Sequence, residues 1–324
     1  MEQRETAGIK RQSEILCCMK YYIKNKTLFL RGNFRAVSSG AGGGLSDVST
    51  IINRTVEKNF VHDSPEKFIE GIVREEGCTG DFYGLLTAVD MKTLCVLINR
   101  TVTVFITAGV SNPNPKNPKL PGTINIIVHS RDGLFDEAMA GLIITATEAK
   151  TEALFSMGYD FAGTTTDAVV ACCSKDNEKI HRYAGRMTDI GRWTAEAVLF
   201  GVQEAIARHD GKKPAEKPAL YVLSTIGGDH WIEWSPEGCP YYPCHFRGQA
   251  CNYCYCPFYP CNDEELGYFI ETSAGGTVWA CTTCILMHHP EIVDHMKKYP
   301  MATISELKKV AEVKNLKINA ETET

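Results

Sequence analysis

The stretch from residue 124 to residue 173 reads INIIVHSRDGLFDEAMAGLIITATEAKTEALFSMGYDFAGTTTDAVVACC. Its first run, INIIV (124–128), is apolar and β-branched and predicts a strand, and DAVVACC (167–173) predicts a second, buried strand. Between them, residues 134–157 have the spacing of a long amphipathic helix that Gly158 terminates. A strand, a helix and a strand in succession are typical of an α/β or α+β domain.

The segments on either side continue this mixture of strands and helices. Strands are predicted at 27–38, 94–98 and 102–107, and helices at 64–76 and 189–209. Ser64 can cap the first of these helices, and Pro65 suits its first turn. The polar segment GKKPAEKP (211–218) predicts a linker. We therefore expect an N-terminal α/β or α+β domain, residues 1–212, with a mixed sheet whose strand order the pattern leaves open.

The composition excludes several classes of protein. Of the 324 residues, 44% are hydrophobic and 23% are charged, which excludes a disordered chain, and the length suggests two domains. No window reaches the ~20 apolar residues of a membrane-spanning helix, and the N-terminus lacks the apolar core of a secretory signal. We therefore expect a cytoplasmic protein without a membrane partner. The net charge of −5 argues against a nucleic-acid partner.

Eight of the fourteen cysteines are concentrated between residues 239 and 284. They form two near copies, CPYYPC (239–244) and CPFYPC (256–261), with CNYC (251–254) between them and CTTC (281–284) beyond. In a chain without an export signal thiols stay reduced, so paired cysteines indicate metal binding rather than disulfides. We expect a small, cysteine-rich, metal-stabilised domain at 219–324 with its core at 239–289.

Eight thiolates match two four-coordinate metal sites. Zinc, as two ions, is the favoured metal because paired cysteines are its usual ligands. An iron–sulfur centre is the alternative, and a set of buried free thiols is a third reading. Neither the metal nor the pairing of its ligands follows from the spacing. The candidate ligands are Cys239, Cys244, Cys251, Cys254, Cys256, Cys261, Cys281 and Cys284, with His245 and His288 able to replace a thiolate or to add a ligand.

The charge of the cysteine-rich domain limits what it can bind. Residues 219–324 contain 7 Lys+Arg and 13 Asp+Glu, which is a net charge of −6, and cysteine thiolates would make it more negative. Binding to a phosphate backbone needs the opposite sign. We therefore expect a structural or interaction role rather than nucleic-acid binding.

In the N-terminal domain, four short motifs are candidates for a ligand site. They are SSGAGGG (38–44), AGVSN (108–112) with GTIN (122–125), TEAKTEAL (147–154) and GTTTD (163–167). Three of them place small or hydroxyl-bearing residues near predicted strand ends, where α/β folds bind ligands. Gly42, Gly43 and Gly44 can present bare N–H groups to an anion or an oxyanion, although a mobile loop would have the same composition.

Glu148 lies at the margin of the apolar face of the predicted helix, on a polar ridge with Thr145 and Glu152. A carboxylate in such a position can act as a general base, whereas a solvated helix flank is the commoner situation. Lys150 projects from the opposite flank and is not expected to pair with Glu148. Asp167 opens a predicted strand, where it can cap a turn or bind a ligand.

Taken in order, SSGAGGG, TAGVSN, GTINIIV, TATEAKTEAL and GTTTDAVVAC resemble the motifs of the adenosylcobinamide amidohydrolase family (CbiZ), over roughly residues 25–210. The tail, from CPYYPC to VWACTTCILMHHP, resembles the cysteine-rich small domain that is fused to such enzymes in methanogenic archaea. Two departures are present: GTTTD replaces a pattern nearer GTGTD, and SNPNP replaces an SNA-type sequence in a loop beside the expected substrate.

This resemblance implies an enzyme of corrinoid salvage. The family hydrolyses the amide that joins the corrin propionate to aminopropanol in adenosylcobinamide, and the product, adenosylcobyric acid, re-enters cobalamin synthesis. It implies a corrinoid substrate and no cofactor for the hydrolytic step, and the protein could form a homo-oligomer. A corrinoid-binding protein without catalysis and a redox protein that passes electrons to cobalt are the alternative functions.

Amide hydrolysis needs an activated nucleophile, an oxyanion stabiliser and a proton donor for the amine. We expect Glu148 to activate water, the amides of Gly42–Gly44 to bind the oxyanion, and Lys150 or Asp167 to be the donor or a substrate ligand. A covalent route through Ser38 or Ser39 is the competing scheme. The candidate substrate contacts are Ser38, Ser39, Gly42, Gly43, Gly44, Ser111, Asn112, Thr164 and Thr166, although turn formation would also explain Ser111 and Asn112.

Overall fold

The computed structural model describes residues 19–110, 122–224, 230–232, 239–273, 275–299 and 302–320. The chain divides into two units, Met1–Leu220 and Tyr221–Thr324. This division falls within strand β11 (Ala219–Ser224), whereas the linker composition predicted a boundary between residues 212 and 219.

Ten strands form one mixed sheet in the order β12–β11–β5–β6–β7–β9–β2–β3–β4, with β1 paired to β2. The pairs β3–β4 and β7–β9 are parallel, whereas β2–β3, β2–β9, β5–β6 and β6–β7 are antiparallel. The predicted mixed sheet is therefore confirmed. The strands are β1 (Lys20–Lys24), β2 (Thr27–Ser38), β3 (Gly44–Thr55), β4 (Phe82–Thr87), β5 (Cys95–Asn99), β6 (Val102–Val110), β7 (Gly122–Ser130), β9 (Ala168–Ser174), β11 (Ala219–Ser224) and β12 (His230–Ile232). A separate parallel pair consists of β8 (Gly133–Leu134) and β10 (Lys179–His181).

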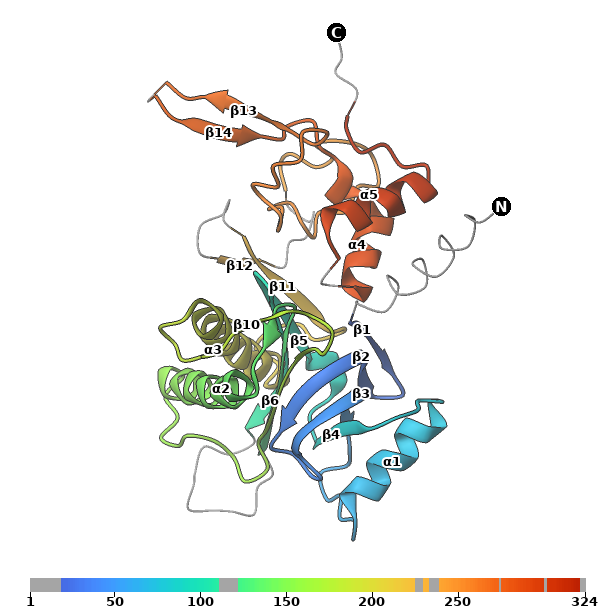
Figure 1. Ribbon diagram of the computed structural model, residues 1–324, viewed down its shortest axis with the longest axis vertical. Helices are drawn as coiled ribbons and strands as arrows, with labels where there is room; N and C mark the ends of the chain where they lie inside the picture. The colour runs from blue at the N-terminus through green and yellow to red at the C-terminus, as the bar shows by residue number, and fades with distance from the viewer. Residues whose placement is uncertain are drawn as a thin grey trace, which may run out of the picture. The chain divides into compact units, whose positions relative to one another are not determined.

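Three helices pack on this sheet: α1 (Pro65–Glu75), α2 (Asp136–Ser156) and α3 (Asp189–His209). The pair α2 and α3 lies side by side against β5, β6 and β9, and α1 lies on the other side beside β4 (Figure 1). None of the helices in the described parts of the chain is long and apolar enough to cross a membrane. All three helices lie where the apolar periodicity predicted them.

The ends of α1 follow the predicted signals. The Ser64 side chain accepts a hydrogen bond from the Lys67 amide at 3.4 Å, and Pro65 occupies the first turn. After the helix, Gly77 has a φ of +72°, the left-handed conformation that glycine adopts at low cost. The buried Ile69 and Val73 then place the apolar stripe of the helix against β2 and β3.

The sheet curls so that β3 and β4 face β6 and β7 across a buried interior. A chain of polar groups joins the two halves: Asn53 of β3 donates to Thr107 of β6 at 2.9 Å, and Asn125 of β7 donates to the Asn53 side chain at 3.0 Å. Asn125 also donates to the carbonyl of Leu86 in β4 at 2.9 Å. Because all these side chains are buried, each hydrogen bond replaces contact with water that burial removed. The network therefore holds β3 and β4 against β6 and β7.

Strand β6 shows why the central strands are continuous apolar runs. All nine of its residues are buried, since one face packs on α3 and the other faces the interior of the curl. The ring of Phe105 lies 5.1 Å from the ring of Tyr21. Tyr21 belongs to β1, which pairs with β2 in the other half of the sheet, so this contact spans the interior. Strands buried on both faces lose the alternation of polar and apolar residues.

The second unit contains little regular structure. Besides β12 and most of β11, its described elements are the hairpin β13 (Tyr268–Glu271) and β14 (Thr277–Ala280), a short 3-10 helix at Leu286–His288, and the helices α4 (Pro290–Lys298) and α5 (Ile304–Val313). The helix α5 begins with a capping box, in which Thr303 and Glu306 bond each other's backbone amides. A small core includes Leu286, Ile292 and Leu307. Residues 239–261, which carry the two near-copied motifs, form turns only.

Candidate functional site

The N-terminal motifs converge at one end of the sheet. Strand β9 lies between β2 and β7, with Val170 opposite Ser38 and Ala168 opposite Asn125. The end of β2, the start of β7 and the loop before β9 therefore meet. Hydrogen bonds described below connect SSGAGGG, GTIN, TEAKTEAL and GTTTD, so segments that are far apart in sequence form one site.

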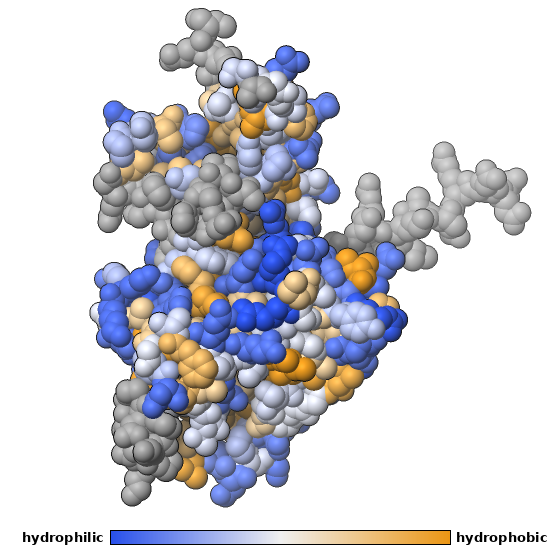
Figure 2. All heavy atoms as spheres, turned by 90° about the vertical axis from the view of Figure 1, so that its left-hand side faces the viewer, coloured by the Kyte–Doolittle hydropathy of each residue, from blue (hydrophilic) through white to orange (hydrophobic). Residues whose placement is uncertain are grey.

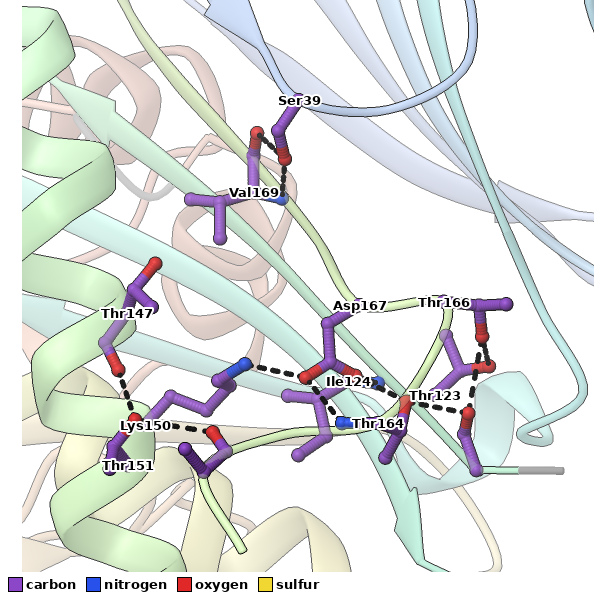
Figure 3. Close-up of polar contacts among 12 residues, drawn as sticks. Ser39, Thr123, Ile124, Thr147, Lys150, Thr151, Thr164, Thr166, Asp167 and Val169 are labelled. Atoms are coloured by element: carbon purple, nitrogen blue, oxygen red, sulfur yellow. Dashed lines mark hydrogen bonds and ion pairs between the residues drawn. The ribbon is translucent and has the colours of Figure 1, made fainter. Parts of the chain in front are cut away.

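Asp167 is the centre of this site (Figure 3). Its Oδ2 accepts from Nζ of Lys150 at 2.5 Å and from the amide of Thr164 at 3.0 Å. Its Oδ1 accepts from the amide of Ile124 at 2.8 Å and from the hydroxyl of Thr164 at 2.6 Å. These four contacts join the Asp167 carboxylate to α2, β7 and its own loop.

The Lys150–Asp167 ion pair is buried, with side chains that are 7% and 10% exposed. The sequence predicts that Lys150 and Glu148 project from different flanks of α2. This agrees with the structure, in which Lys150 pairs with Asp167 and not with Glu148. Gly163 makes room for the pair, because a Cβ there would lie 2.5 Å from Nζ of Lys150 and 2.6 Å from Oδ2 of Asp167. The glycine of GTTTD therefore leaves the space that the ion pair occupies.

The threonines of GTTTD attach the loop to β7. The Thr164 hydroxyl lies 2.7 Å from the carbonyl oxygen of Gly122, and the Thr166 hydroxyl lies 3.1 Å from the same oxygen. Thr166 and Thr123 are also joined through their hydroxyls at 2.8 Å. These contacts fix the loop to the first residues of β7, beside the buried Lys150–Asp167 pair.

Ser38 and Ser39 are engaged with the backbone. The Ser39 hydroxyl accepts from the amide of Val169 at 2.9 Å and lies 3.3 Å from its carbonyl oxygen (Figure 3). The Ser38 hydroxyl accepts from the amide of Gly40 at 3.1 Å. Neither contact activates a nucleophile, because no general base takes the proton.

The glycine motif forms the tight turn between β2 and β3. The amide of Gly43 donates to the carbonyl of Gly40 at 3.0 Å, and a Cβ at Gly43 would overlap the carbonyl oxygen of Ser38. The amide of Gly43 is therefore occupied, while that of Gly42 has no partner among the described residues. Gly44 pairs with Ser38 at the start of β3.

Glu148 lies outside the Asp167 network. Its side chain is exposed on α2 and borders an open groove of about 620 Å³ with Thr147, Thr151 and Phe155. Thr151 connects this groove to the motif loop through the carbonyl of Ala162 at 3.1 Å. Figure 2 shows this side of the molecule, where hydrophobic residues form separate patches among hydrophilic ones. The carboxylate has no hydrogen-bond partner among the described residues.

The polar ridge predicted around Glu148 is only partly present. Thr145 is buried, and its hydroxyl donates to the carbonyl of Ala184 at 2.7 Å. Glu152 is on the surface and forms an ion pair with Arg186 at 2.5 Å. The spacing places all three residues on one polar ridge beside the apolar face, but the loop before α3 covers Thr145. Ser111 and Asn112 lie outside the described residues.

Sequence reasoning missed two polar features beside the site. The first is the contact of Asn125 and Thr107 with Asn53. Asn125 and Thr107 belong to the quoted motifs, but only the curl of the sheet brings them to Asn53. The available signal was an asparagine inside an apolar run, which indicates a buried polar contact. The second is His209, whose imidazole lies against Gly109, where a Cβ would be 2.8 Å from Nε2. Nothing in the spacing connects these two residues.

The cysteines of the second unit fall into two sets. Repulsion between thiols raises pKa values within each set, in addition to the larger effect of burial. The Cys254 pKa is raised by the other three members of set A, and the Cys256 pKa is raised to about 12 with contributions from the other three members of set B. Set A comprises Cys239, Cys244, Cys251 and Cys254, and set B comprises Cys256, Cys261, Cys281 and Cys284.

Set A is organised by Gln249. Its side-chain amide nitrogen lies 3.2 Å from Sγ of Cys244 and 3.5 Å from Sγ of Cys251, while its carbonyl oxygen accepts from the amide of His245 at 2.8 Å. An amide that donates to two sulfur atoms is the outer-shell arrangement that orients thiolate ligands. Gln249 is 4% exposed, so this orientation is fixed by packing.

Set B lines a cavity of about 210 Å³, which Cys254, His245 and His288 also border. The His245 and His288 rings lie 4.4 Å apart, and Nδ1 of His288 lies 3.1 Å from the carbonyl oxygen of Ala250. Burial lowers the pKa of both histidines. Burial therefore favours the neutral imidazole, the form that can bind a metal beside the thiols.

The donor chemistry of these sets fits a thiolate-bound metal. The eight cysteines are all free thiols, and hydrogen bonds from Gln249 reach two of them. No group of three or more potential ligand side chains in the described residues lies close enough together to enclose an ion. A metal would have to draw the members of each set together, as expected where metal binding and folding are coupled.

Comparisons with known proteins agree with this division of the chain. The family model for adenosylcobinamide amidohydrolase matches residues 19–214, and the model for a cysteine-rich small domain matches residues 230–311. An adenosylcobinamide amidohydrolase of Methanosarcina mazei is 45% identical over 197 residues, which are 58% of this chain and 98% of that protein. One from Halobacterium salinarum is 29% identical over 194 residues, or 56% and 83% of the two chains.

Among solved structures, a Pyrococcus horikoshii protein matches with a TM-score of 0.31 and 13% identity, covering 58% of this chain and 82% of its own. The fold and the family model together define an amidohydrolase built on a mixed sheet, followed by a cysteine-rich domain that suggests metal binding. The chain belongs to the adenosylcobinamide amidohydrolase family.

Proposed function

We propose that this protein hydrolyses the amide bond between the corrin propionate and aminopropanol in adenosylcobinamide. The products are adenosylcobyric acid and aminopropanol, and the reaction serves corrinoid salvage for cobalamin synthesis. The observation that carries the proposal is the convergence of three family motifs, GTIN, TEAKTEAL and GTTTD, on the hydrogen-bonded centre at Asp167, beside which Ser39 of the fourth motif bonds Val169. Family membership supplies the substrate and the bond that is cleaved.

Glu148 acts as the base that takes a proton from water. Its carboxylate is exposed beside the groove that Thr151 connects to the motif loop, whereas both oxygens of Asp167 already accept two hydrogen bonds each. The Lys150–Asp167 pair, expected to be the proton donor or a substrate ligand, is assigned a positioning role instead, because its two groups bind each other, and it holds the loop with Thr164 and Thr166. The proton that Glu148 takes from water then passes to the leaving amine. The unpartnered amide of Gly42 is the proposed oxyanion donor of the glycine turn.

The activity is tested by incubating the purified protein with adenosylcobinamide and analysing the mixture by mass spectrometry. Adenosylcobyric acid and free aminopropanol are the expected products. Intact adenosylcobinamide that co-elutes with the protein would instead identify a corrinoid-binding protein, and substrate that is neither bound nor cleaved would contradict the assignment.

Glu148→Gln tests the base. We expect kcat to fall about 10²–10⁴-fold, the usual contribution of general-base catalysis, with thermal stability unchanged because the side chain is exposed. Glu137→Gln, at another exposed position of α2, is the control. Full activity of Glu148→Gln would show that the base lies elsewhere, and an acyl-enzyme trapped at Ser38 or Ser39 would replace water by a serine nucleophile.

We also propose that the cysteine-rich unit binds two zinc ions that stabilise its fold. Two four-cysteine sets match two closed tetrahedral sites, and a closed site leaves no position for a substrate. The role is therefore structural and separate from hydrolysis. Metal analysis of the purified protein tests this, with two zinc ions per chain expected; iron, acid-labile sulfide and a brown colour would identify the redox alternative.

A further inference from the structure

We propose that each metal ion is held by one CPxYPC motif together with the CxxC motif that follows it: set A, Cys239, Cys244, Cys251 and Cys254, forms one site and set B, Cys256, Cys261, Cys281 and Cys284, forms the other. This inference rests on the proposed metal-binding function and adds the pairing of its ligands. The spacing alone also permits the opposite arrangement, in which the two CPxYPC motifs share one ion and the two CxxC motifs share the other.

The backbone repeats the same pair of turns in each set. The amide of Tyr242 donates to the carbonyl of Cys239 at 3.3 Å, and the amide of Tyr259 donates to that of Cys256 at 3.2 Å. Each CxxC motif closes a turn in which the amide of its second cysteine donates to the carbonyl of its first, at 3.1 Å in both CNYC and CTTC. Each set therefore has one complete copy of two turns that direct paired thiols.

Direct contacts connect the two motifs of set A. The amide nitrogen of Gln249 contacts both Sγ of Cys244, from CPYYPC, and Sγ of Cys251, from CNYC. Because one nitrogen atom contacts both sulfur atoms, Sγ of Cys244 and Sγ of Cys251 must lie close to each other. The buried Gln249 side chain lies between the motifs in sequence and joins them in space, which the opposite arrangement would not require.

Set B is brought together by the cavity that all four of its thiols line. Cys256 and Cys261 reach it from CPFYPC, while Cys281 and Cys284 reach it from the segment after β14. Of set A, only Cys254 borders this cavity. The position of the hairpin β13–β14 between the motifs explains the longer spacing in set B, because the hairpin returns the chain to the same place.

Four cysteines complete each proposed tetrahedral site. His245 and His288 therefore lie outside both coordination spheres. The carbonyl contact of His288 and its contact with the His245 ring then serve packing between the two sites.

Metal stoichiometry in double variants of the full chain distinguishes the two arrangements. The wild-type protein and the variants are loaded with zinc and weighed by native mass spectrometry. Cys244→Ser/Cys251→Ser removes two ligands of set A and is expected to retain one of two ions. Cys261→Ser/Cys281→Ser removes two ligands of set B and is expected to retain the other ion. Cys244→Ser/Cys261→Ser damages both sets and is expected to lose both ions, whereas the opposite arrangement would retain one.

The opposite arrangement predicts a different result. Cys244 and Cys251 would then be ligands of different ions, and the Cys244→Ser/Cys251→Ser variant would lose both ions. That result would overturn the pairing while the metal-binding function remains. A wild-type protein that binds no metal would overturn both proposals. The variants His245→Ala and His288→Ala are expected to keep two ions, and loss of one ion in either would show that a histidine is a ligand.

An experiment on the wild-type protein avoids variants that fail to fold. The zinc-loaded protein is treated with limiting chelator and alkylated, and the labelled cysteines are identified by peptide mass spectrometry. Release of one ion is expected to expose four thiols together, all from set A or all from set B. Molecules labelled at Cys244 and Cys261 but protected at Cys251 would contradict the pairing.

Discussion

At the scale of single residues, the Lys150–Asp167 ion pair couples stability to the site. Two buried charges stabilise a fold when they are paired and hydrogen-bonded, and removing one leaves the other without compensation. Asp167 retains three donors without Lys150, whereas nothing else in the described residues is seen to contact the Lys150 ammonium. Loss of Asp167 should therefore be the more damaging of the two changes.

We expect Lys150→Met and Asp167→Asn each to reduce stability by about 3–5 kcal/mol, the cost of breaking a buried pair. The double variant should lose less than the sum of the two, because neither charge is then left alone. Urea unfolding of the four proteins measures this difference. Additive losses would show that the pair contributes no mutual stabilisation.

The same pair controls activity through the GTTTD loop. In Lys150→Met we expect kcat to fall about 10²-fold, since a small displacement of a positioned group is enough for such a loss. The assay follows aminopropanol release at a temperature where the variant is folded. An unchanged kcat in a folded variant would show that the loop needs no anchor in α2.

His129 makes stability depend on pH. Burial lowers its pKa to about 4, while the unfolded chain has the ordinary value of 6.5. Between these values only the unfolded state binds the proton, so the contribution of His129 to stability falls as the pH is lowered from about 6.5 to about 4 and changes no further below that. The difference in pKa corresponds to a loss on the order of 3 kcal/mol.

His129→Gln removes this titration and should flatten the dependence of unfolding free energy on pH between 4 and 6.5. The comparison of the two proteins isolates His129, because the histidines of lowered pKa in the second unit titrate in both. Parallel stability curves for the wild type and the variant would contradict the prediction.

At the scale of elements, helix α3 depends on a close approach that only glycine allows. A Cβ at Gly191, in its first turn, would overlap the carbonyl oxygens of Ala184 and Gly185. The same loop accepts the Thr145 hydroxyl from α2, so the contact joins both helices that cover the sheet. On α1, Gly71 has nothing within 4 Å of its Cβ position.

Gly191→Ala and Gly71→Ala make the same chemical change with opposite expected results. Gly191→Ala should destabilise by about 1–3 kcal/mol through overpacking against backbone, although alanine favours a helix. Gly71→Ala should stabilise by about 0.5–1 kcal/mol through helix propensity alone. Thermal unfolding of both variants measures the contrast, and a shift of the same sign in both would show that packing at Gly191 is not limiting.

At the scale of the whole molecule, the proposed metal sites and the proposed hydrolytic site lie in different units. Chelation should therefore unfold the cysteine-rich unit, because metal binding contributes its folding energy, while aminopropanol release continues at a little-changed rate. Circular dichroism and the product assay on the same sample test this, and reloading with zinc is the control. Loss of hydrolysis that zinc restores would show that the cysteine-rich unit takes part in the reaction.

Local signals in the sequence were sufficient for most elements of the first unit. Helix α3 spans 189–209 as its periodicity predicts, β2 spans 27–38, and Ser64 caps α1. Propensity, capping and apolar spacing are short-range properties and are readable without the fold. The helices α4 and α5 were not predicted, although Pro290 and the Thr303–Glu306 capping box are signals of the same kind.

By itself, the sequence determined the fold class, the motifs of the family and the identity of the eight thiols. Only the tertiary structure decided the strand order, the Lys150–Asp167 pair and the contact of Gln249 with two cysteines. The physical reason is the same in each case. Burial, ion pairing and the curl of the sheet depend on which distant segments come together, and spacing along the chain carries no record of that.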